Sequence, residues 1–409
     1  MNKLFYIILL ISLQMQAQYE VPPETGVSFN KIVLLDQYIS EGAVIGDVDN
    51  DGNQDVIAGS LWWKGPDFKK SFSLAPVKIF PITGPGLEGY ATNFFSFTDF
   101  IDNDNWIDLL QVGLPGTDSY WIQNPGKDSF EASNKDKELQ KNKAQTHICN
   151  ESPQFLDIIG DSKKELLAIS NGKITLGISN DSGQEWKTVA ISHHDPKRFP
   201  VYMHGLGAGD INLDGRMDIL EKSGWWEQPN NWDLKTTWKF HAYPFSPDQG
   251  GAQMYAYDID GDGDNDVLTS MNAHAYGLSW HEQIEKNGEI SFLEHQIMAN
   301  KNVKNSYGIS FSQLHAIALA DFDNDGITDF VTGKCYYAHN GHDPGGEDPA
   351  VLYWFKTQRR SDGTVDMIPY LIDDNSGVGR QISTGDLNND GKMDIVVSNK
   401  KGVFAFVQK

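Results

Sequence analysis

Short apolar runs of strand length recur along the chain, and polar loops rich in aspartate separate them in pairs. The pairs AVIG and DVIAG (43–46 and 55–59), AIALA and DFVTG (316–320 and 329–333), and QISTG and DIVVS (381–385 and 394–398) each flank one such loop. The runs are short, rich in β-branched residues and bounded by Gly, Asp and Asn, which is typical of β-strands. Each pair therefore predicts a β-hairpin.

The loops repeat one pattern, D-x-[DN]-x-D-G-x-x-D. It is complete at 47–55 (DVDNDGNQD), 210–218 (DINLDGRMD), 258–266 (DIDGDGDND), 321–329 (DFDNDGITD) and 386–394 (DLNNDGKMD). Two weaker copies lie between the first and second of these, at 99–108 (DFIDNDNWID) and 157–165 (DIIGDSKKE). Because the copies recur every 48–65 residues, the sequence predicts a repeat architecture.

The spacing of the loop suits Ca²⁺. Oxygens at positions 1, 3, 5 and 9, with a backbone carbonyl near position 7, can surround one hard cation, and Gly at position 6 permits the sharp turn. An EF-hand is excluded because position 12 is Ala58, Thr269, Thr332 and Val397 in four copies and an acid, Glu221, in only one. We expect about five calcium sites, with the two weaker loops weak or empty. The predicted ligands are Asp47, Asp49, Asp51, Asp55, Asp210, Asn212, Asp214, Asp218, Asp258, Asp260, Asp262, Asp266, Asp321, Asp323, Asp325, Asp329, Asp386, Asn388, Asp390 and Asp394.

A third apolar run follows each hairpin, often with tryptophan, as in LWWKG, GWWEQ and LYWFK, and a fourth follows in most units. Four strands per unit and seven units predict an all-β, seven-bladed β-propeller. The last unit ends after its third strand, while FNKIVLL at 29–35 has no unit of its own. We therefore predict that this N-terminal strand completes the last blade and closes the ring.

The motif D-x-D-x-D-G-x-x-D between strands resembles the FG-GAP or VCBS-type repeat propellers, from about residue 29 to the end of the chain. That resemblance implies a scaffold and an ion rather than a function. The segments NESPQF, HGLGAGD, GWWEQP, GGAQMYAYD and GVGRQ are similar to bacterial secreted propellers related to the propeller half of aldos-2-ulose dehydratase. This second resemblance implies a lyase that removes water from keto-sugars.

The N-terminus and the charge indicate an exported protein with no nucleic-acid partner. Lys3, an apolar run at 4–13 and Ala17 predict a signal peptide at 1–17, followed by a single domain at 18–409 in the periplasm or outside the cell. No other apolar stretch is long enough to span a bilayer. The net charge of −23 is concentrated in the aspartate loops, and no basic stripe is present. With only Cys149 and Cys335, the fold is not a disulfide framework.

The candidate site comes from one equivalent position in each unit. The residue six places before the first aspartate should lie on the face opposite the loops, around the channel mouth. Those residues are Glu41, Asn93, Glu151, His204, Ala252, His315 and Arg380. Such a polar and ionisable set favours a site that binds a hydroxylated ligand and transfers protons. The alternative interpretation is a hydrated channel entrance that binds no ligand.

The predicted chemistry is elimination on a keto-sugar or uronate-type sugar, which makes the protein a carbon–oxygen lyase. His204 and His315 are the first candidates for base and acid, and Arg380 or Lys334 would stabilise the enolate-like charge. The full catalytic set is His204, His315, Tyr255, Arg380, Lys334, His274, Tyr276 and Glu151. The predicted substrate contacts are Glu41, Asn93, Gln253, Gln313, Trp225 and Glu221. In a variant of this hypothesis, His204, His315 and a carboxylate hold a transition metal that polarises the carbonyl.

Three alternatives remain open at this stage. The first is a non-catalytic carbohydrate-binding or adhesion propeller, whose pockets should repeat between blades, whereas the long unlike loops at 243–253, 300–313 and 336–350 favour one central site. The second is a glycosidase that uses Glu41 and Glu151 as its carboxylate pair. The third is a partner-binding surface, for which the segment GHDPGGEDPA is too polar.

Overall fold

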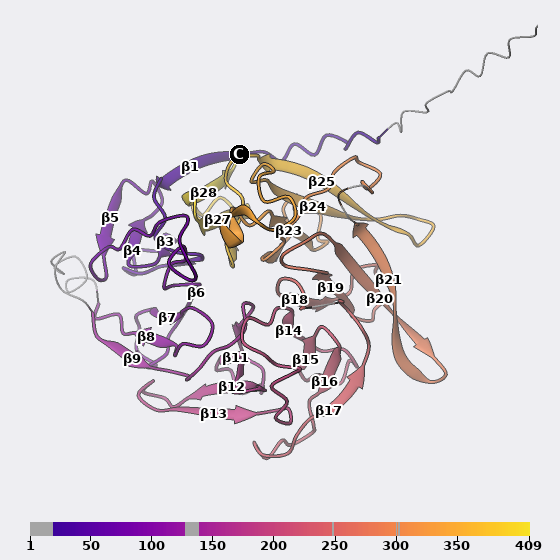
Figure 1. Ribbon diagram of the computed structural model, residues 1–409, viewed down its shortest axis with the longest axis horizontal. Helices are drawn as coiled ribbons and strands as arrows, with labels where there is room; N and C mark the ends of the chain where they lie inside the picture. The colour runs from indigo at the N-terminus through magenta and orange to yellow at the C-terminus, as the bar shows by residue number, and fades with distance from the viewer. Residues whose placement is uncertain (1–18, 127–138, 248, 300, 302) are drawn as a thin grey trace, which may run out of the picture.

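Strands joined by loops and turns make up the described part of this protein. The computed structural model describes residues 19–409 except 127–138, 248, 300 and 302 (Figure 1). The predicted signal peptide therefore lies outside the described residues. In the described part the one helical segment is a short 3-10 turn, η1 (Ala338–Gly341), and no helix there has the length and apolarity to cross a membrane.

The strands form antiparallel sheets arranged around a ring (Figure 1). Three four-stranded sheets come first in the chain: β2 (Ala43–Gly46), β3 (Asp55–Ala58), β4 (Leu61–Lys64) and β5 (Lys70–Ser73); β6 (Phe95–Asp99), β7 (Asp108–Val112), β8 (Tyr120–Ile122) and β9 (Lys141–Lys143); and β10 (Gln154–Leu156), β11 (Glu165–Ser170), β12 (Lys173–Ser179) and β13 (Trp186–Ala190). Two more come last: β22 (Ile317–Ala320), β23 (Asp329–Gly333), β24 (Leu352–Arg359) and β25 (Val365–Asp373); and β26 (Ile382–Gly385), β27 (Asp394–Asn399), β28 (Gly402–Gln408) and β1 (Phe29–Leu35). The first strands of neighbouring sheets contact one another around the centre. This arrangement is a β-propeller.

The remaining strands form one eight-stranded sheet, so the ring has five separate four-stranded blades instead of the seven predicted. Its strands are β14 (Leu206–Gly209), β15 (Asp218–Glu221), β16 (Gly224–Glu227), β17 (Lys239–Ala242), β18 (Met254–Tyr257), β19 (Asp266–Ser270), β20 (Leu278–Lys286) and β21 (Glu289–Met298). The two halves join where β14 pairs in parallel with β18 through Gly207 and Ala208. A Cβ on Gly207 would lie 2.1 Å from the carbonyl oxygen of Met254. The missing side chain therefore allows the two first strands to pair.

The N-terminal strand closes the ring as predicted. Strand β1 pairs antiparallel with β28, from Phe29 opposite Gln408 to Leu35 opposite Val403. The last sheet thereby joins the two ends of the described chain, which lie in the same part of Figure 1. Each end depends on the other for its strand partner, and this interlock stabilises a closed propeller.

The acid at the end of each aspartate loop has a structural role in every repeat. Its buried or nearly buried carboxylate accepts a hydrogen bond from the backbone N–H seven residues earlier, and in six loops the other oxygen accepts one from the backbone at or just after the third strand. These acids are Asp55, Asp108, Glu165, Asp218, Asp266, Asp329 and Asp394. Two of them, Asp108 and Glu165, belong to the degenerate copies. The acid therefore fixes the hairpin even where the other ligand positions have been lost.

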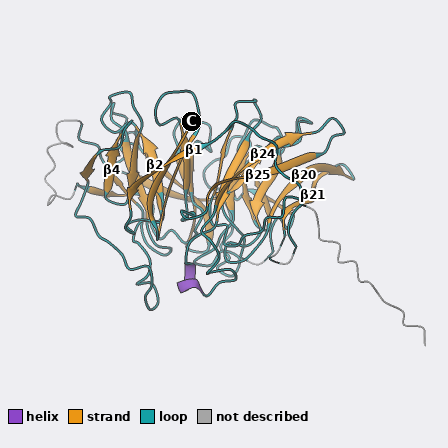
Figure 2. Cartoon of the chain, turned by 90° about the horizontal axis from the view of Figure 1, so that it is seen from above, coloured by secondary structure: helices purple, strands orange, loops and turns teal. Residues whose placement is uncertain are grey.

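The aspartate loops and η1 lie at opposite ends of the strands. The loops join first to second strands, whereas η1 joins the second strand β23 to the third strand β24. Antiparallel strands alternate direction, so these two kinds of connection emerge on opposite faces. Figure 2 shows loops on both faces of the disc, with η1 on one of them. The face that carries η1 is the one on which the sequence predicts a site.

Candidate functional site

Four of the equivalent positions predicted from the repeat meet near the centre of the η1 face. His204 precedes β14, His315 precedes β22, Arg380 precedes β26 and Glu151 precedes β10. All four side chains are buried. Because each residue leads into the first strand of its unit, the repeat itself brings them together.

Three histidines face one another at this centre. Nε2 of His204 lies 3.1 Å from Nε2 of His274, which follows β19. The ring centroid of His315 lies 5.3 Å from that of His204 and 4.7 Å from that of His274. One nitrogen of each ring lies within 4.8 Å of those of the other two. This is the spacing at which three imidazoles can share one transition-metal ion.

The environment keeps the buried histidines neutral. Burial, aided by the neighbouring His274 and the Arg380 guanidinium, lowers the pKa of His204 to about 4, against the opposing charge of Glu151. Burial and Arg380 also hold the pKa of His315 well below its usual range. Nδ1 of His204 and Nε2 of His315 have no hydrogen-bond partner in the described part of the chain. Neutral imidazole nitrogens without partners can serve as metal ligands.

Asp343 orients the third histidine. Its carboxylate lies 3.1 Å from Nδ1 of His274 and 3.0 Å from Nδ1 of His339, a residue of η1 whose ring stacks on that of His274. Burial opposes ionisation of Asp343, but these two hydrogen bonds outweigh it and hold the pKa of the carboxyl below its usual range. The bond from Asp343 in turn raises the pKa of His339. A carboxylate behind a histidine is the usual device that fixes the tautomer and orientation of a metal ligand.

A loop from the first blade holds η1 in place. The backbone N–H of His339 donates to the hydroxyl of Tyr90, and the side chain of Asn340 exchanges two hydrogen bonds with the backbone of Gly84. Nζ of Lys400 bridges the carbonyls of Ile82 and Tyr337. The connection between β5 and β6 and the segment around η1 therefore meet on this face.

Arg380 is the charge centre beneath the histidines. Its Nε donates to Glu151 at 2.6 Å, and its Nη1 lies 3.7 Å from a carboxylate oxygen of Glu41 and 2.8 Å from Sγ of Cys335. The hydroxyl of Tyr38 donates to Glu41. Burial raises the pKa of the Cys335 thiol to about 11 despite the adjacent guanidinium. Both glutamates are thus committed to Arg380, which argues against a glycosidase that uses them as its acid and base.

The other predicted site residues divide into three groups. Two of them have unpartnered polar atoms beside the histidines in the described structure: the Tyr276 hydroxyl and both side-chain polar atoms of Gln313. The backbone N–H of Gln313 donates to Ala275, next to His274. Such a concentration of buried, unsatisfied polar atoms is a mark of a ligand site, because buried polar groups are normally paired.

The second group is satisfied within the scaffold. The Tyr255 hydroxyl donates to the carbonyl of Ile317, and burial raises its pKa, so its position argues against the predicted role as a base. Nζ of Lys334 donates to the carbonyl of Gly346, and burial lowers its pKa. Gln253 joins the carbonyl of Arg380 to the N–H of Ile317. These contacts position the site instead of facing a ligand.

Three predicted substrate contacts lie elsewhere in the scaffold. The ring of Trp225 is covered, at 2% exposure, and stacks on His241 with centroids 4.0 Å apart. Glu221 is fully buried and forms an ion pair with Arg198. The amide of Asn93 bonds to Ser40 and to the backbone of Phe95. The positions of Trp225 and Glu221 argue against substrate contact, since a repeated tryptophan on a third strand packs in the core.

The sequence placed His339 among the residues that follow second strands on this face but not in the catalytic set, and it did not single out Asp343. They lie in the segment between β23 and β24, outside the repeated positions, so the counting rule could not reach them. The available signal is their spacing of four residues. Cys149 and Cys335 are both free and buried, so the site is not closed by a disulfide.

The aspartate loops gather carboxylates as predicted, and calcium binding stays a prediction. Ligand oxygens lie within 4.8 Å of one another in three groups among the described residues: Asp47, Asp49 and Asp55; Asp258, Asp260 and Asp262; and Asp321, Asp323 and Asp325. Lysines on the third strands pair with two loops, Lys64 with Asp49 and Asp51 and Lys356 with Asp323 and Asp325. Burial raises the pKa of Asp55 to about 7 against its backbone hydrogen bonds. A bound cation would offset that penalty.

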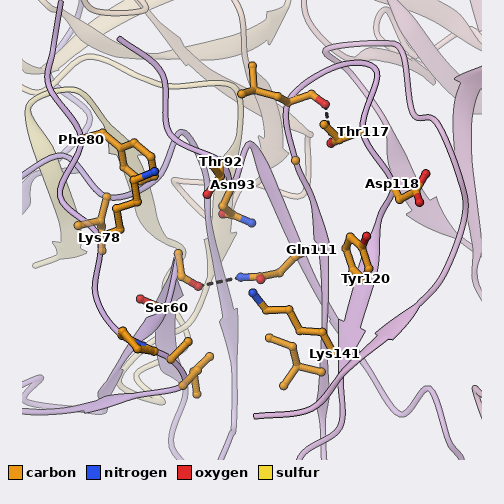
Figure 3. A pocket seen from close by; sticks show the side chains of 18 of the residues that line it. Ser60, Lys78, Phe80, Thr92, Asn93, Gln111, Thr117, Asp118, Tyr120 and Lys141 are labelled. Carbon is orange, nitrogen blue, oxygen red and sulfur yellow. Dashed lines mark hydrogen bonds between the residues drawn. The ribbon is translucent and has the colours of Figure 1, made fainter. Parts of the chain in front are cut away.

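A separate cavity of about 770 Å³ opens between the first two blades (Figure 3). Among the predicted site residues only Asn93 lines it, and the histidines do not. The chemistry of the centre and this cavity therefore lie in two different places. We assign the reactive chemistry to the centre because nitrogens of three histidines converge there.

Comparison with known proteins supports the repeat. Residues 321–397 match the family described as FG-GAP-like repeat, so this β-propeller contains at least one such repeat. No curated protein matches the chain. Among solved structures, a lectin from Agrocybe aegerita, described as specifically recognising non-reducing terminal N-acetylglucosamine, is similar with 13% identity, a TM-score of 0.44 and coverage of 92% of this chain and 87% of that one. Virginiamycin B lyase from Staphylococcus aureus is similar with 10% identity, a TM-score of 0.47 and coverage of 93% and 99%. At these scores neither structure supports a statement about ligand or reaction.

Proposed function

We propose that this protein is an exported, calcium-binding β-propeller that eliminates water from a keto-sugar or uronate-type sugar at a metal site formed by His204, His274 and His315. The observation that carries the proposal is the meeting of these three imidazoles, with one nitrogen of each ring within 4.8 Å of those of the other two. We further propose that the eight-stranded sheet acts as two blades, since each half has four antiparallel strands and one aspartate loop. On that count the ring has the seven blades expected from the sequence.

The ligand set fits a divalent transition metal. Three imidazoles, two of them kept neutral by burial and the third backed by a carboxylate, suit Zn²⁺ or a similar ion and leave its fourth coordination position for substrate. When bound, such an ion polarises a carbonyl oxygen and so makes the neighbouring C–H bond more acidic. In this account His204 and His315 bind the metal, in place of the base and acid roles first expected for them.

His339 is the residue we assign as the base. Its Nδ1 faces Asp343, which leaves Nε2 as the acceptor in the neutral ring. The hydrogen bond to Asp343 raises the pKa of His339, which makes its imidazole a stronger general base. Nε2 takes a proton from the carbon beside the carbonyl, the C–H electron pair forms a carbon–carbon double bond, and the hydroxyl on the next carbon leaves. The imidazolium returns the proton to that hydroxyl, so the products are an enone and water.

The remaining unpaired groups bind the substrate. The Tyr276 hydroxyl and the Gln313 amide can hydrogen-bond the sugar hydroxyls, since their own polar atoms have no partner among the described residues. Arg380 carries a positive charge next to the site, and its ion pairs with Glu151 and Glu41 neutralise that charge. It therefore tunes the site electrostatically without having to contact the substrate.

The proposal is tested by following ultraviolet absorbance in the enone band. The chain without residues 1–17, loaded with Zn²⁺ and Ca²⁺, is incubated with keto-sugars and with uronate oligosaccharides. Rising absorbance is expected, and it should be lost in His274→Ala and in His339→Ala but retained in His193→Ala, which changes an exposed histidine outside the site. Saccharide binding without product in any of these conditions would instead identify a non-catalytic carbohydrate-binding propeller.

A further inference from the structure

We propose that the cavity between the first two blades is a second binding site, for an acidic saccharide, separate from the histidine centre. Its volume of about 770 Å³ falls within the range of roughly 300–1,000 Å³ that small-molecule sites occupy. Nothing in this proposal depends on the metal or on the elimination reaction.

The cavity is formed by connections on the η1 face. The turn between β3 and β4 supplies Ser60, the connection after β5 supplies Lys78 and Phe80, and the residues before β6 supply Thr92. Tyr120 on β8 closes the far side, and Figure 3 shows these side chains around one open space. Because the residues come from two blades, the site exists only once the ring has assembled.

The polar groups of the wall match a polyhydroxylated ligand. The hydroxyls of Ser60, Thr92 and Tyr120 make no hydrogen bond to any described residue. Nε2 of Gln111 donates to the carbonyl of Gly59 at 2.7 Å, which fixes the amide in the wall and leaves its oxygen as an acceptor. Unpaired donors and acceptors that surround a concave site are the groups that orient a bound molecule.

The apolar groups match the faces of sugar rings. Tyr120 is 37% exposed, and Ile39, Leu74 and Ile122 also line the cavity. An aromatic ring with one open face stacks on the C–H face of a pyranose while its hydroxyl stays available for a hydrogen bond. A mixed surface of this kind favours a saccharide over a purely apolar or purely ionic ligand.

The charge indicates an acidic saccharide. Nζ of Lys78 lies 4.5 Å from the centroid of Phe80 and has no carboxylate partner within the described residues. The one acid in the wall, Asp118, is paired with Lys143 at 2.6 Å. The wall is therefore locally positive on a chain of net charge −23. An unpaired ammonium beside hydroxyls and an open aromatic ring is a place for a sugar carboxylate.

The cavity is linked to the centre through the scaffold alone. Phe80 packs on Tyr38 with ring centroids 6.0 Å apart, and the Tyr38 hydroxyl donates to Glu41, a partner of Arg380. This wall of side chains separates the two sites. Variants of the histidine centre should therefore leave the cavity unchanged.

The test is a calorimetric titration of the chain without residues 1–17, in calcium, with an oligogalacturonate trimer and with its fully methyl-esterified form. The two probes share the same sugar backbone, and their carboxyl groups are ionised in the acid and neutral methyl esters in the other form. The acid should bind more tightly than the ester, Lys78→Met should weaken the acid at least tenfold and abolish that preference, and Tyr120→Ala should weaken both probes. Both variants change exposed side chains, so the fold is retained.

Two controls decide the interpretation. Lys187→Met, at an exposed lysine on β13, should leave both affinities unchanged, and so should His274→Ala. Equal affinity for acid and ester, or wild-type affinities in both Lys78→Met and Tyr120→Ala, would overturn the proposal. Loss of binding in His274→Ala would place the ligand at the histidine centre and would also overturn it.

Discussion

Nε2 of His204 lies 3.1 Å from Nε2 of His274, although 70 residues separate them in the chain. His204 leads into β14 and His274 follows β19, so the joined sheet that spans both units sets the distance between them. Two acceptor-capable nitrogens can face each other at this separation through a shared proton or a shared metal. The third ring, His315, and the carboxylate behind His274 favour the metal.

Arg380 should contribute strongly to stability. Arg380→Met leaves Glu41 and Glu151 buried without a cation, and we expect the free energy of unfolding at pH 7 to fall by about 3–5 kcal/mol. Chemical denaturation measures it. The matched control Arg360→Met removes an exposed partner of Asp366 and should have little effect. Equal losses in the two variants would contradict the assigned charge centre.

Trp225 should act on stability and not on the site. Trp225→Ala removes a buried ring that stacks on His241, so we expect a loss of about 3–5 kcal/mol in the free energy of unfolding. Below the melting temperature the variant should bind zinc as the wild type does. A variant of normal stability with weakened saccharide binding would restore the substrate role first expected for this residue.

His281 should make the protein sensitive to mild acid. Burial lowers its pKa to about 4, whereas the unfolded chain should titrate near 6.5. As the pH falls, the unfolded state binds the proton on His281 before the folded state does. The contribution of neutral His281 to the free energy of unfolding is therefore fully present above about pH 6.5 and is lost as the pH falls toward 4. Between pH 7 and pH 5, protonation linked to His281 should lower the free energy of unfolding by about 2 kcal/mol. Chemical denaturation of His281→Gln at both pH values should show a smaller drop in the free energy of unfolding than the wild type shows. An identical drop in the two proteins would refute the assignment.

Calcium should stabilise the propeller through the aspartate loops. Removing it with a chelator should lower the Tm strongly, because binding to the folded hairpins adds to the folding free energy. Asp260→Asn, in a complete loop, should reduce the bound calcium by one ion. Asp161→Asn, in the degenerate loop at 157–165, should leave the count unchanged. A Tm that does not respond to chelator would show that the carboxylates, with Lys64 and Lys356, are sufficient without an ion.

Much of the fold follows from the sequence because the repeat carries its own register. Counting from the first aspartate placed His204, His315, Glu151 and Arg380 at equivalent positions, and the structure brings these four residues to the centre. The unpaired third strand of the last unit identified β1 as its partner. Both inferences depend on the residue spacing within each repeat, which is the same in every unit of a periodic fold.

Other features depend on contacts that cannot be inferred from the residue spacing of the repeat. The fusion of two units into one sheet depends on Gly207, where any side chain would collide with Met254. Asp343 and His339 lie in a connection that belongs to one unit only, so no repeat points to them. Trp225 was assigned to the ligand because packing and stacking use the same residue type. The cavity between the first blades arises from four connections that no single motif marks.

The most direct test of the central claim is a calorimetric titration of Zn²⁺ into the metal-free chain with the aspartate loops saturated by Ca²⁺. The account predicts one tight site in the wild type and in His193→Ala, and its loss in His204→Ala and His274→Ala. Equal zinc affinity in all four proteins would contradict a metal centre at these histidines.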